Sequence, residues 1–358
     1  MTAVALPAAP AVHRRRGMVL VTMALALPVT FALAVTLGST PIPLDAALAA
    51  LVRAPSADPG VQEIIWTVRL PRAITAALAG AALSVAGAQM QTLFRNPLAE
   101  PYILGVSSGA SLGVAVIIVG WGGTVGAFTA GISGLGRLGV VVAASAGAGA
   151  VLALVLTLSR RVRSVVTLLV VGVMVGSAST SVITLLLVYT DPQRAQQFIS
   201  WGLGSFAGTT WADLALFAPV CLAGLGLALA GVKPLNALLL GENYARTMGV
   251  RVRLVRTLTL AVASVLAGAV TAYCGPVAFL GLAVPHVARL LLGTADHRLL
   301  MPGVTFLGAA TALLCCVATQ LPGSGVVLPL NAVTTIVGAP VVITILLRSR
   351  AARTGLAV

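Results

Sequence analysis

Apolar runs of about twenty residues recur along the whole chain, separated by short polar or basic connections. A helix of about 20 apolar residues is long enough to cross the ~30 Å hydrocarbon core of a bilayer. Charged residues make up only 8% of the chain, against about 25% in soluble domains. The sequence therefore predicts an all-α, multi-pass integral membrane protein in contact with membrane lipid.

The apolar runs predict ten transmembrane helices, at residues 17–37, 72–93, 103–120, 138–158, 165–188, 213–231, 257–273, 277–293, 301–319 and 330–347. The first run could pass for a signal peptide, but its length favours an uncleaved span. We therefore expect a single ten-helix domain over 17–347, between an N-terminal tail (1–16) and a C-terminal tail (348–358). A long loop is expected over 38–70. The pattern predicts one short surface helix in 190–212 and two in 233–256.

The distribution of basic residues orients these helices, because the cytoplasmic loops of membrane proteins collect arginine and lysine. With the N-terminus inside, 17 of the 22 basic residues lie on the cytoplasmic side; the remaining five are Arg53, Arg69, Arg72, Arg137 and Arg194. This asymmetry predicts that the protein lies in the cytoplasmic membrane with both termini in the cytoplasm. It also accounts for the net charge of +14 without nucleic acid, since no basic stripe is interleaved with aromatic residues.

An internal repeat links the two halves of the chain. Four residues recur at a constant offset of 188 residues: Gly80, Gly87, Pro97 and Gly105 match Gly268, Gly275, Pro285 and Gly293. Glycine is abundant here, so chance identity is the alternative explanation. The offset carries the second span onto the seventh, five spans later, so the copies run in opposite directions. Such an inverted repeat (spans 2–5 versus 7–10) is typical of transporters, whose substrate path lies between the halves.

The predicted spans contain almost no charge, because all eight acidic residues fall in loops or at span edges. Ion-coupled transporters usually keep ionisable groups inside the membrane, and a membrane enzyme needs its catalytic groups at one depth. The pattern therefore disfavours both and indicates an external energy source. The four cysteines and three histidines have no metal-ligand spacing. We expect no cofactor or metal on this chain, and hydrogen-bonded structural roles for His286 and His297.

Three polar segments are candidates for function. Loop 233–256 is amphipathic and broken by two glycines, so it is either a docking site for a cytoplasmic partner or a solvated loop. Arg69 and Arg72 either anchor the second span at the outer interface or bind acidic side chains of an external partner. Ser107 and Ser108 either line a polar path or pack between helices.

Five motifs in order then carry a family resemblance between about residues 60 and 347. They are RLPR (69–72), GAQMQTLFRNPLAEPYILGVSSGA (87–110), LLLGENYARTMGV (238–250), FLGLAVPHVARLLLGTADHRLLMPG (279–303) and VLPLNAVTTIVGAPVV (327–342). Together they resemble the FecCD family, the membrane permeases of ABC importers for iron-siderophores, haem and cobalamin. The resemblance implies ten spans, in agreement with the hydropathy count. It also implies a transport subunit that is not itself an enzyme.

The resemblance further implies a set of partners and an ATP-driven, alternating-access mechanism. The partners are a second permease chain, identical or homologous, two cytoplasmic ABC ATPase subunits that hold ATP and Mg²⁺, and an extracytoplasmic substrate-binding protein. Residues that match the family's ATPase-coupling loop are Leu240, Gly241, Glu242, Ala245, Arg246, Met248 and Gly249. Arg69 and Arg72 match arginines that pair with glutamates of the binding protein. The family turn at the cytoplasmic end of the second span is matched by Gln91, Arg95, Asn96 and Pro97.

The chain departs from the family pattern at its outer face and at one connection. Cys316, Gln320 and Val327 stand where many members have Asp, Arg and Glu, which removes the basis for a third external arginine contact. Residues 164–166 are less polar than in many members, so no gate residues are assigned there. Iron-siderophore is the leading substrate within the family. The alternatives are haem or cobalamin, an ion-coupled secondary transporter, and a structural membrane scaffold.

Overall fold

The structure, a computed structural model, describes residues 9–120, 135–161, 165–320 and 327–354, and within these ranges it contains helices and no strand. The helices of the first half are α1 (Ala9–Thr36), α2 (Leu44–Leu51), α3 (Pro59–Ile64), η1 (Ile65–Arg69), α4 (Leu70–Leu93), η2 (Pro101–Leu104), α5 (Val106–Gly120), α7 (Leu135–Arg161) and α8 (Val165–Val188). Those of the second half are α9 (Pro192–Gly202), α10 (Trp211–Ala230), α11 (Val232–Leu239), α12 (Glu242–Thr247), α13 (Val252–Cys274), α14 (Leu280–Leu292), α15 (His297–Thr319) and α16 (Leu330–Thr354).

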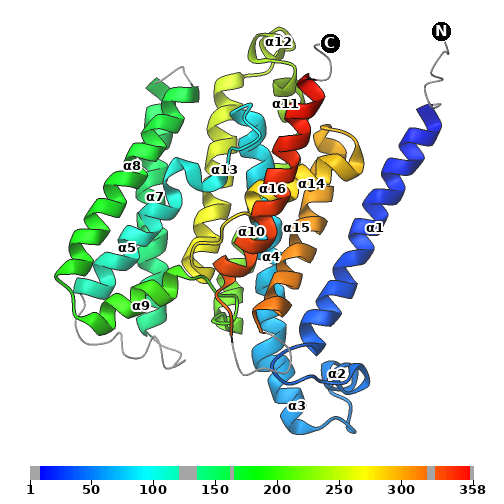
Figure 1. The fold of residues 1–358 in the computed structure, drawn as a ribbon, viewed down its shortest axis with the longest axis vertical. Helices are drawn as coiled ribbons and strands as arrows, with labels where there is room; N and C mark the ends of the chain where they lie inside the picture. Colours follow the sequence, from blue (N-terminus) through cyan, green and yellow to red (C-terminus); the bar gives the residue numbers. More distant parts are fainter. Residues whose placement is uncertain (1–8, 121–134, 162–164, 321–326, 355–358) are drawn as a thin grey trace.

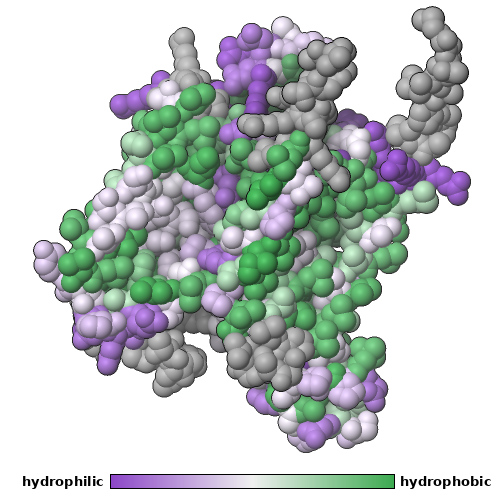
Figure 2. Space-filling model, in the orientation of Figure 1, coloured by the Kyte–Doolittle hydropathy of each residue, from purple (hydrophilic) through white to green (hydrophobic). Residues whose placement is uncertain are grey.

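The predicted all-helical membrane fold is confirmed. Among the described residues, seven helices are long and apolar enough to cross a membrane, and three shorter apolar helices accompany them over Val106–Val119, Leu280–Leu292 and Leu330–Thr344. Together they correspond to the ten predicted spans. Hydrophobic residues cover the flanks of the bundle, and the most hydrophilic residues gather mainly at its two ends (Figure 2).

The two ends of the bundle carry different elements (Figure 1). The first turns of α1, the last turns of α16, and helices α11 and α12 lie at one end, whereas α2, α3 and α9 lie at the other. The basic residues concentrate at the α12 end, which is therefore the cytoplasmic face. Arg95, after α4, donates to Leu238 O of α11 (3.4 Å), and Arg256, near the start of α13, pairs with Glu242 of α12 (2.8 Å). Helix α4 thus ends where α13 begins, and the two run in opposite directions.

Helix packing follows the predicted inverted pairing. Helix α4 packs on α15 as α13 packs on α7, and α5 packs on α7 and α8 as α14 packs on α15 and α16. The constant offset of 188 residues is wrong beyond the first helix pair, however. Helix α5 starts at Val106, whose equivalent would be residue 294, but α14 has already ended at Leu292. The connection before α14 is shorter, because the turn 94–105 with η2 has no counterpart there.

Helix α4 lies at the centre of the bundle and is almost entirely buried. Its glycines allow backbone-to-backbone contact, as small residues do in membrane helices. A Cβ on Gly87 would lie 1.8 Å from Gly281 O of α14, and one on Gly80 would lie 2.2 Å from Gly308 O of α15. Helix α4 is therefore held by neighbours that touch its main chain.

Three predicted boundaries are wrong. The expected loop 38–70 contains α2, α3 and η1, and α3, η1 and α4 form one continuous helix over Pro59–Leu93. Tertiary contacts stabilise this region: the Trp66 indole donates to Ala50 O (3.1 Å), stacks against Trp211 and lies under the Arg53 guanidinium. Helices α1 and α16 also extend into the expected tails, which are rich in the good helix formers alanine and arginine.

Candidate functional site

The loop 233–256 forms a compact helical unit at the cytoplasmic face. Gly241 separates α11 from α12 with φ +119° and ψ 147°, a region open essentially to glycine. Glu242 starts α12 and pairs with Arg256 of α13 (2.8 Å) and with Arg246 one turn later (3.6 Å). Ala245 of α12 is buried. The two predicted short helices are present, and a charge pair ties α12 to a transmembrane helix.

This unit presents large apolar side chains to the aqueous phase. Leu240, Tyr244 and Met248 are 65%, 55% and 58% exposed. A groove runs beside them, lined by α12 and by Leu93, Phe94 and Arg95 at the end of α4. Contiguous exposed apolar surface of this kind marks a protein-interaction site. We refer to Leu240, Tyr244 and Met248 below as the cytoplasmic patch.

The turn after α4 is architectural. Gln91 is buried, accepts from Arg289 Nη1 of α14 (2.5 Å) and donates to Leu282 O (3.2 Å). Arg95 has a left-handed φ of +47°, and the Asn96 side chain accepts from Leu98 N–H (2.9 Å) just after Pro97. These contacts fix α4 against α14 and α11, so Gln91 is not available to line a path.

Arg69 does not lie where a docking residue must lie. Its side chain is only 5% exposed, and its guanidinium donates to Val35 O and Thr36 O (2.7 Å each) and to Thr40 O (2.5 Å). These carbonyls belong to the end of α1 and the segment after it, which have no intrahelical donors left. The predicted docking role of Arg69 is therefore replaced by capping of α1.

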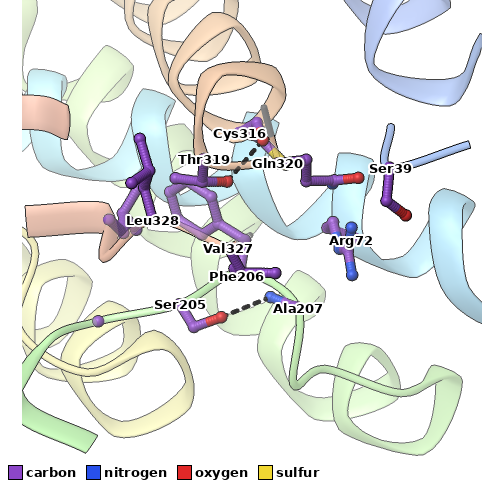
Figure 3. Close-up of a pocket in the computed structure, with 12 residues that line it drawn as sticks. Ser39, Arg72, Ser205, Phe206, Ala207, Cys316, Thr319, Gln320, Val327 and Leu328 are labelled. Atoms are coloured by element: carbon purple, nitrogen blue, oxygen red, sulfur yellow. Dashed lines mark hydrogen bonds between the residues drawn. The ribbon is translucent and has the colours of Figure 1, made fainter. Parts of the chain in front are cut away.

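Arg72 lies one turn further along and faces a pocket of about 110 Å³ at the outer end of the bundle (Figure 3). Its Nε atom is buried and has no hydrogen-bond partner among the described residues. The three positions at which the family pattern breaks, Cys316, Gln320 and Val327, all line this pocket. A water molecule occupies about 30 Å³ in the liquid, so the pocket has room for a carboxylate beside Arg72.

Substitution is expected to distinguish the structural role of Arg69 from the role of Arg72 by their effects on stability. Arg69→Met is expected to destabilise the protein by about 3 kcal/mol, since hydrogen bonds to charged groups contribute about 1.5–3 kcal/mol each. Arg72→Met is expected to change stability by about 0.5 kcal/mol or less, as for most substitutions outside the core. The apparent melting temperature in mild detergent measures both. Equal losses for the two variants would contradict the capping role of Arg69.

A break between α13 and α14 brings polar groups into the bundle. At 1.5 Å per residue, the 13 residues of α14 span about 20 Å, too short for a bilayer. The irregular segment 275–279 completes the crossing. Irregular backbone at this depth is tolerated only where protein or an aqueous cavity satisfies its polar groups.

Three side chains satisfy that segment. Asn331 of α16 accepts from Ala278 N–H (3.0 Å) and donates to Pro276 O (2.8 Å) and Gly202 O (3.0 Å). Glu100 accepts from Phe279 N–H (3.2 Å), and the Tyr102 hydroxyl accepts from Val277 N–H (3.4 Å). The broken segment is thereby tied to α16, α9 and the turn before α5.

Glu100 lies outside the helices, as the sequence predicts, but the residue is only partly exposed. The residue belongs to a loop in the sequence, but the loop folds back against the first turn of α14. A carboxylate is stabilised at a helix N-terminus by the helix dipole. The dipeptide Gly275-Pro276 signals the break, but nothing in the sequence connects it to residue 100.

Ser108 lies in a shallow groove between η2–α5 and α8, together with Gly105, Gly172, Ser177 and Thr180. Ser107 is half-buried beside it and does not line the groove. Helix α8 continues with exposed hydroxyls at Ser181 and Thr184, and Thr180, Ser181 and Thr184 each donate to a carbonyl of their own helix. Hydroxyls bonded in this way remain as acceptors without an unsatisfied donor, which suits a weakly polar surface.

The remaining polar candidates behave as structural groups. All four cysteines are buried and free, and no group of three metal-ligating side chains occurs among the described residues. His286 Nδ1 lies 3.0 Å from Leu282 O. His297 is fully buried, and its ring Nδ1 is hydrogen-bonded to Asn236 Oδ1. Ser164, in the connection for which no gate residues were assigned, lies outside the described residues.

Comparison with known proteins gives one consistent result. The model of the FecCD transport family matches residues 26–348. An uncharacterized ABC transporter permease, YvrB of Bacillus subtilis, is 39% identical over 299 residues, covering 82% of this chain and 81% of the relative. The vitamin B12 import permease BtuC of Citrobacter koseri is 36% identical over 287 residues, covering 80% and 83%. A solved structure described as an inward-facing, metal-chelate type ABC transporter superposes with a TM-score of 0.80 at 28% identity, covering 93% of this chain and 99% of that one.

Proposed function

The chain belongs to the FecCD transport family of ABC importer permeases, and from this premise we propose that it carries an iron-siderophore across the cytoplasmic membrane. The observation that supports ATP-driven transport most directly is the cytoplasmic patch on the helical unit hinged at Gly241. An exposed apolar patch at an aqueous face calls for a protein partner. In this proposal the partner is an ABC ATPase subunit, which binds ATP and Mg²⁺ and hydrolyses ATP.

Transport follows from how this unit is attached. Helix α12 is joined to α13 by the Glu242–Arg256 pair, and Arg95 links the end of α4 to α11. Closure of two ATPase subunits would displace both short helices together. Since α4 and α13 are the paired helices of the inverted repeat, that displacement rocks the two halves against each other and opens the path to one side.

The second permease chain, identical or homologous, is proposed to face α8. This helix exposes a row of hydroxyls at Ser177, Ser181 and Thr184 among large apolar residues. A weakly polar wall suits a bulky chelate, because tight binding inside the path would slow release. Ser108 is proposed to line the same path through its groove with α8.

The outer pocket supports docking of an extracytoplasmic binding protein. Arg72 faces this pocket, and its buried Nε has no hydrogen-bond partner among the described residues. An acidic side chain of the binding protein would pair with its guanidinium. Charge pairing of this kind sets orientation and association rate more than affinity. Because neutral residues replace the family's charges around it, docking here is proposed to depend on Arg72.

The substrate is proposed as a ferric siderophore, with haem and cobalamin as the competing cargoes. All three are large metal chelates. The relative named for vitamin B12 import is 36% identical to this chain, and the metal-chelate type structure is 28% identical to it. Family likeness therefore supports the chelate class, and the siderophore is chosen within it as the most common cargo of the family.

Reconstitution decides between these substrates and mechanisms. The permease is combined with its ATPase and binding protein in liposomes, and uptake of a radiolabelled ferric siderophore, haem and cyanocobalamin is compared with and without ATP. Siderophore uptake that requires ATP hydrolysis is the expected result. Uptake of cobalamin alone or haem alone would show that this compound, and not the siderophore, is the substrate. Uptake driven by a proton gradient without ATP would overturn the ABC mechanism and point to Glu100 as the coupling group.

Gly241 provides a test of coupling. Gly241→Ala is expected to lower ATP-driven uptake about tenfold, because a side chain at this φ costs about 1–3 kcal/mol and shifts α12 relative to α11. Gly231→Ala is the matched control, since Gly231 also adjoins α11 but has φ −77°. Uptake and ATP hydrolysis by the assembled complex are measured for both. Equal activity of the two variants would show that the Gly241 geometry is not needed.

A further inference from the structure

A chain of buried hydrogen bonds connects α11 to two transmembrane helices. Asn236 of α11 presents its Oδ1 atom to the backbone N–H and to ring Nδ1 of His297, both at 2.8 Å. His297 opens α15 and is fully buried. Its other ring nitrogen, Nε2, lies 2.9 Å from Thr92 Oγ1 in the last turn of α4. The three side chains belong to three different helices and meet below the cytoplasmic surface.

The orientation of the Asn236 amide is determined by its second contact. Asn236 Nδ2 donates to Asp296 Oδ1 (2.6 Å), and the same carboxylate oxygen accepts from Arg298 N–H (2.9 Å) as the N-cap of α15. A flipped amide would place its NH₂ group against the His297 N–H and its oxygen against the carboxylate. The side-chain carbonyl of Asn236 therefore faces His297. Ring Nδ1 of His297 carries a proton and donates it to Asn236 Oδ1.

The hydroxyl of Thr92 completes the chain. Neutral imidazole with a proton on Nδ1 has an acceptor at Nε2, and the Thr92 hydroxyl is placed to donate to it. The same hydroxyl lies 2.9 Å from Ala88 O of its own helix. One proton cannot serve both acceptors, so the Thr92 hydroxyl donates either to His297 Nε2 of α15 or to Ala88 O of its own helix. A contact with two discrete arrangements can carry coupling between distant elements.

Helix α15 extends from this contact to the outer face. Its 23 residues span about 35 Å at 1.5 Å per residue. Cys316 and Thr319 of its last turn and its C-cap residue Gln320 line the outer pocket. A hydrogen bond from Arg95, just after α4, to Leu238 O also reaches α11, but it is long at 3.4 Å and made by an exposed residue. The buried chain is therefore the tighter of these two hydrogen-bonded connections between α11 and the membrane helices.

We propose that Asn236, His297 and Thr92 are positioning residues that couple α11 to α15 and α4, so that displacement of α11 moves the outer end of α15. We refer to these three residues as the relay. The inference rests on the proposed function, because it assumes that an ATPase subunit docks on the unit formed by α11 and α12.

The test uses threonine variants that differ only in the hydroxyl. Thr92→Val removes the bond to His297 and keeps the shape, and Thr92→Ser restores a hydroxyl. Thr305→Val is the control, because Thr305 lies on α15 and its hydroxyl donates to Met301 O of the same helix. Spin labels at Leu216 of α10 and Leu314 of α15, both exposed, report the ATP-driven distance change in the reconstituted permease–ATPase complex.

The relay predicts a specific pattern. Thr92→Val is expected to reduce the ATP-driven shift in the distance equilibrium about tenfold, within the 5–150-fold range of couplings between sites. ATP hydrolysis should match that of Thr305→Val, and Thr92→Ser should recover the shift. Asn236→Ala interrupts the relay at its other end. The double variant should therefore lose no more than the larger single loss.

Three outcomes would overturn the proposal. A normal shift in Thr92→Val would show that the hydroxyl carries no coupling. An equal loss in Thr305→Val would assign the effect to helix stability, and additive losses in the double variant would show that the two sites act separately. If the wild-type complex binds no ATPase or shows no ATP-driven shift, the proposed function itself fails, and this result is distinguishable from the other three.

Discussion

Gly87→Leu is expected to prevent most of the protein from reaching a folded state, whereas Gly226→Leu is expected to leave it folded. A Cβ at Gly87 would lie 1.8 Å from Gly281 O, 2.5 Å from Gly281 C and 2.7 Å from Gly281 Cα. These are backbone atoms that no rotamer change can move. Overpacking of a core usually costs about 1–3 kcal/mol, and separating α14 from α4 is expected to exceed that range.

The matched position makes this result interpretable. Gly226 lies inside α10 with no atom within 4 Å of the added Cβ, so the same substitution introduces the same side chain without a collision. Replacing a glycine inside a helix gains up to about 1 kcal/mol of helix propensity. The fraction of expressed protein that elutes as a single monodisperse species in mild detergent is the measurement. Similar yields for both variants would mean that α4 and α14 are not in backbone contact.

Asn331→Leu is the second substitution with a large expected effect. It removes the partner of one N–H, at Ala278, and of two carbonyls, at Pro276 and Gly202, in three part-buried hydrogen bonds. Each buried polar group left unsatisfied costs about 1–3 kcal/mol. We expect a loss of about 3 kcal/mol or more, together with loss of transport, because the segment before α14 would no longer be held against α16.

Hydrogen exchange locates the effect. In wild-type protein the amides of residues 277–279 should be protected, and in Asn331→Leu they should exchange far faster while the amides of α4 remain protected. Asn243→Leu is the control, since Asn243 is exposed on α12. Unchanged protection at 277–279 in the Asn331 variant would show that its amide does not hold the break.

Local sequence was sufficient for the features that depend on hydropathy and backbone chemistry. The ten apolar runs, the concentration of arginine at one face and the division of α11 from α12 at Gly241 follow from the solvent preference of short segments. The bilayer makes these signals strong, because a spanning segment must satisfy its own backbone. Helix boundaries were less predictable. Contacts of Trp66 with Ala50 and Arg53 stabilise the helices over 44–69, and no local sequence pattern indicates these contacts.

Side-chain roles depended on distant partners and were predicted less well. Arg69 reads as an exposed docking residue beside Arg72, yet carbonyls more than thirty positions earlier in the chain surround its guanidinium. Glu100 reads as a loop residue, yet it accepts from the amide of Phe279. The relay was equally hidden, since Asn236, His297 and Thr92 share no motif. The resemblance to a family identifies matching sequence blocks, but it does not show which of their residues are in contact.

The continuous helix over Pro59–Leu93 also shapes how a partner can approach from outside. Its 35 residues correspond to about 52 Å, more than the ~40–45 Å of a whole bilayer with its headgroups. Because its inner end lies at the cytoplasmic face, the excess length of this helix, which includes α3, projects outward together with α2 (Figure 1). Arg72 lies 13 residues, or about 20 Å, below the tip of this projection. The outer pocket is thus recessed beside this projection. A docking protein must have a surface shaped to fit past the projection before its acidic side chain can reach Arg72.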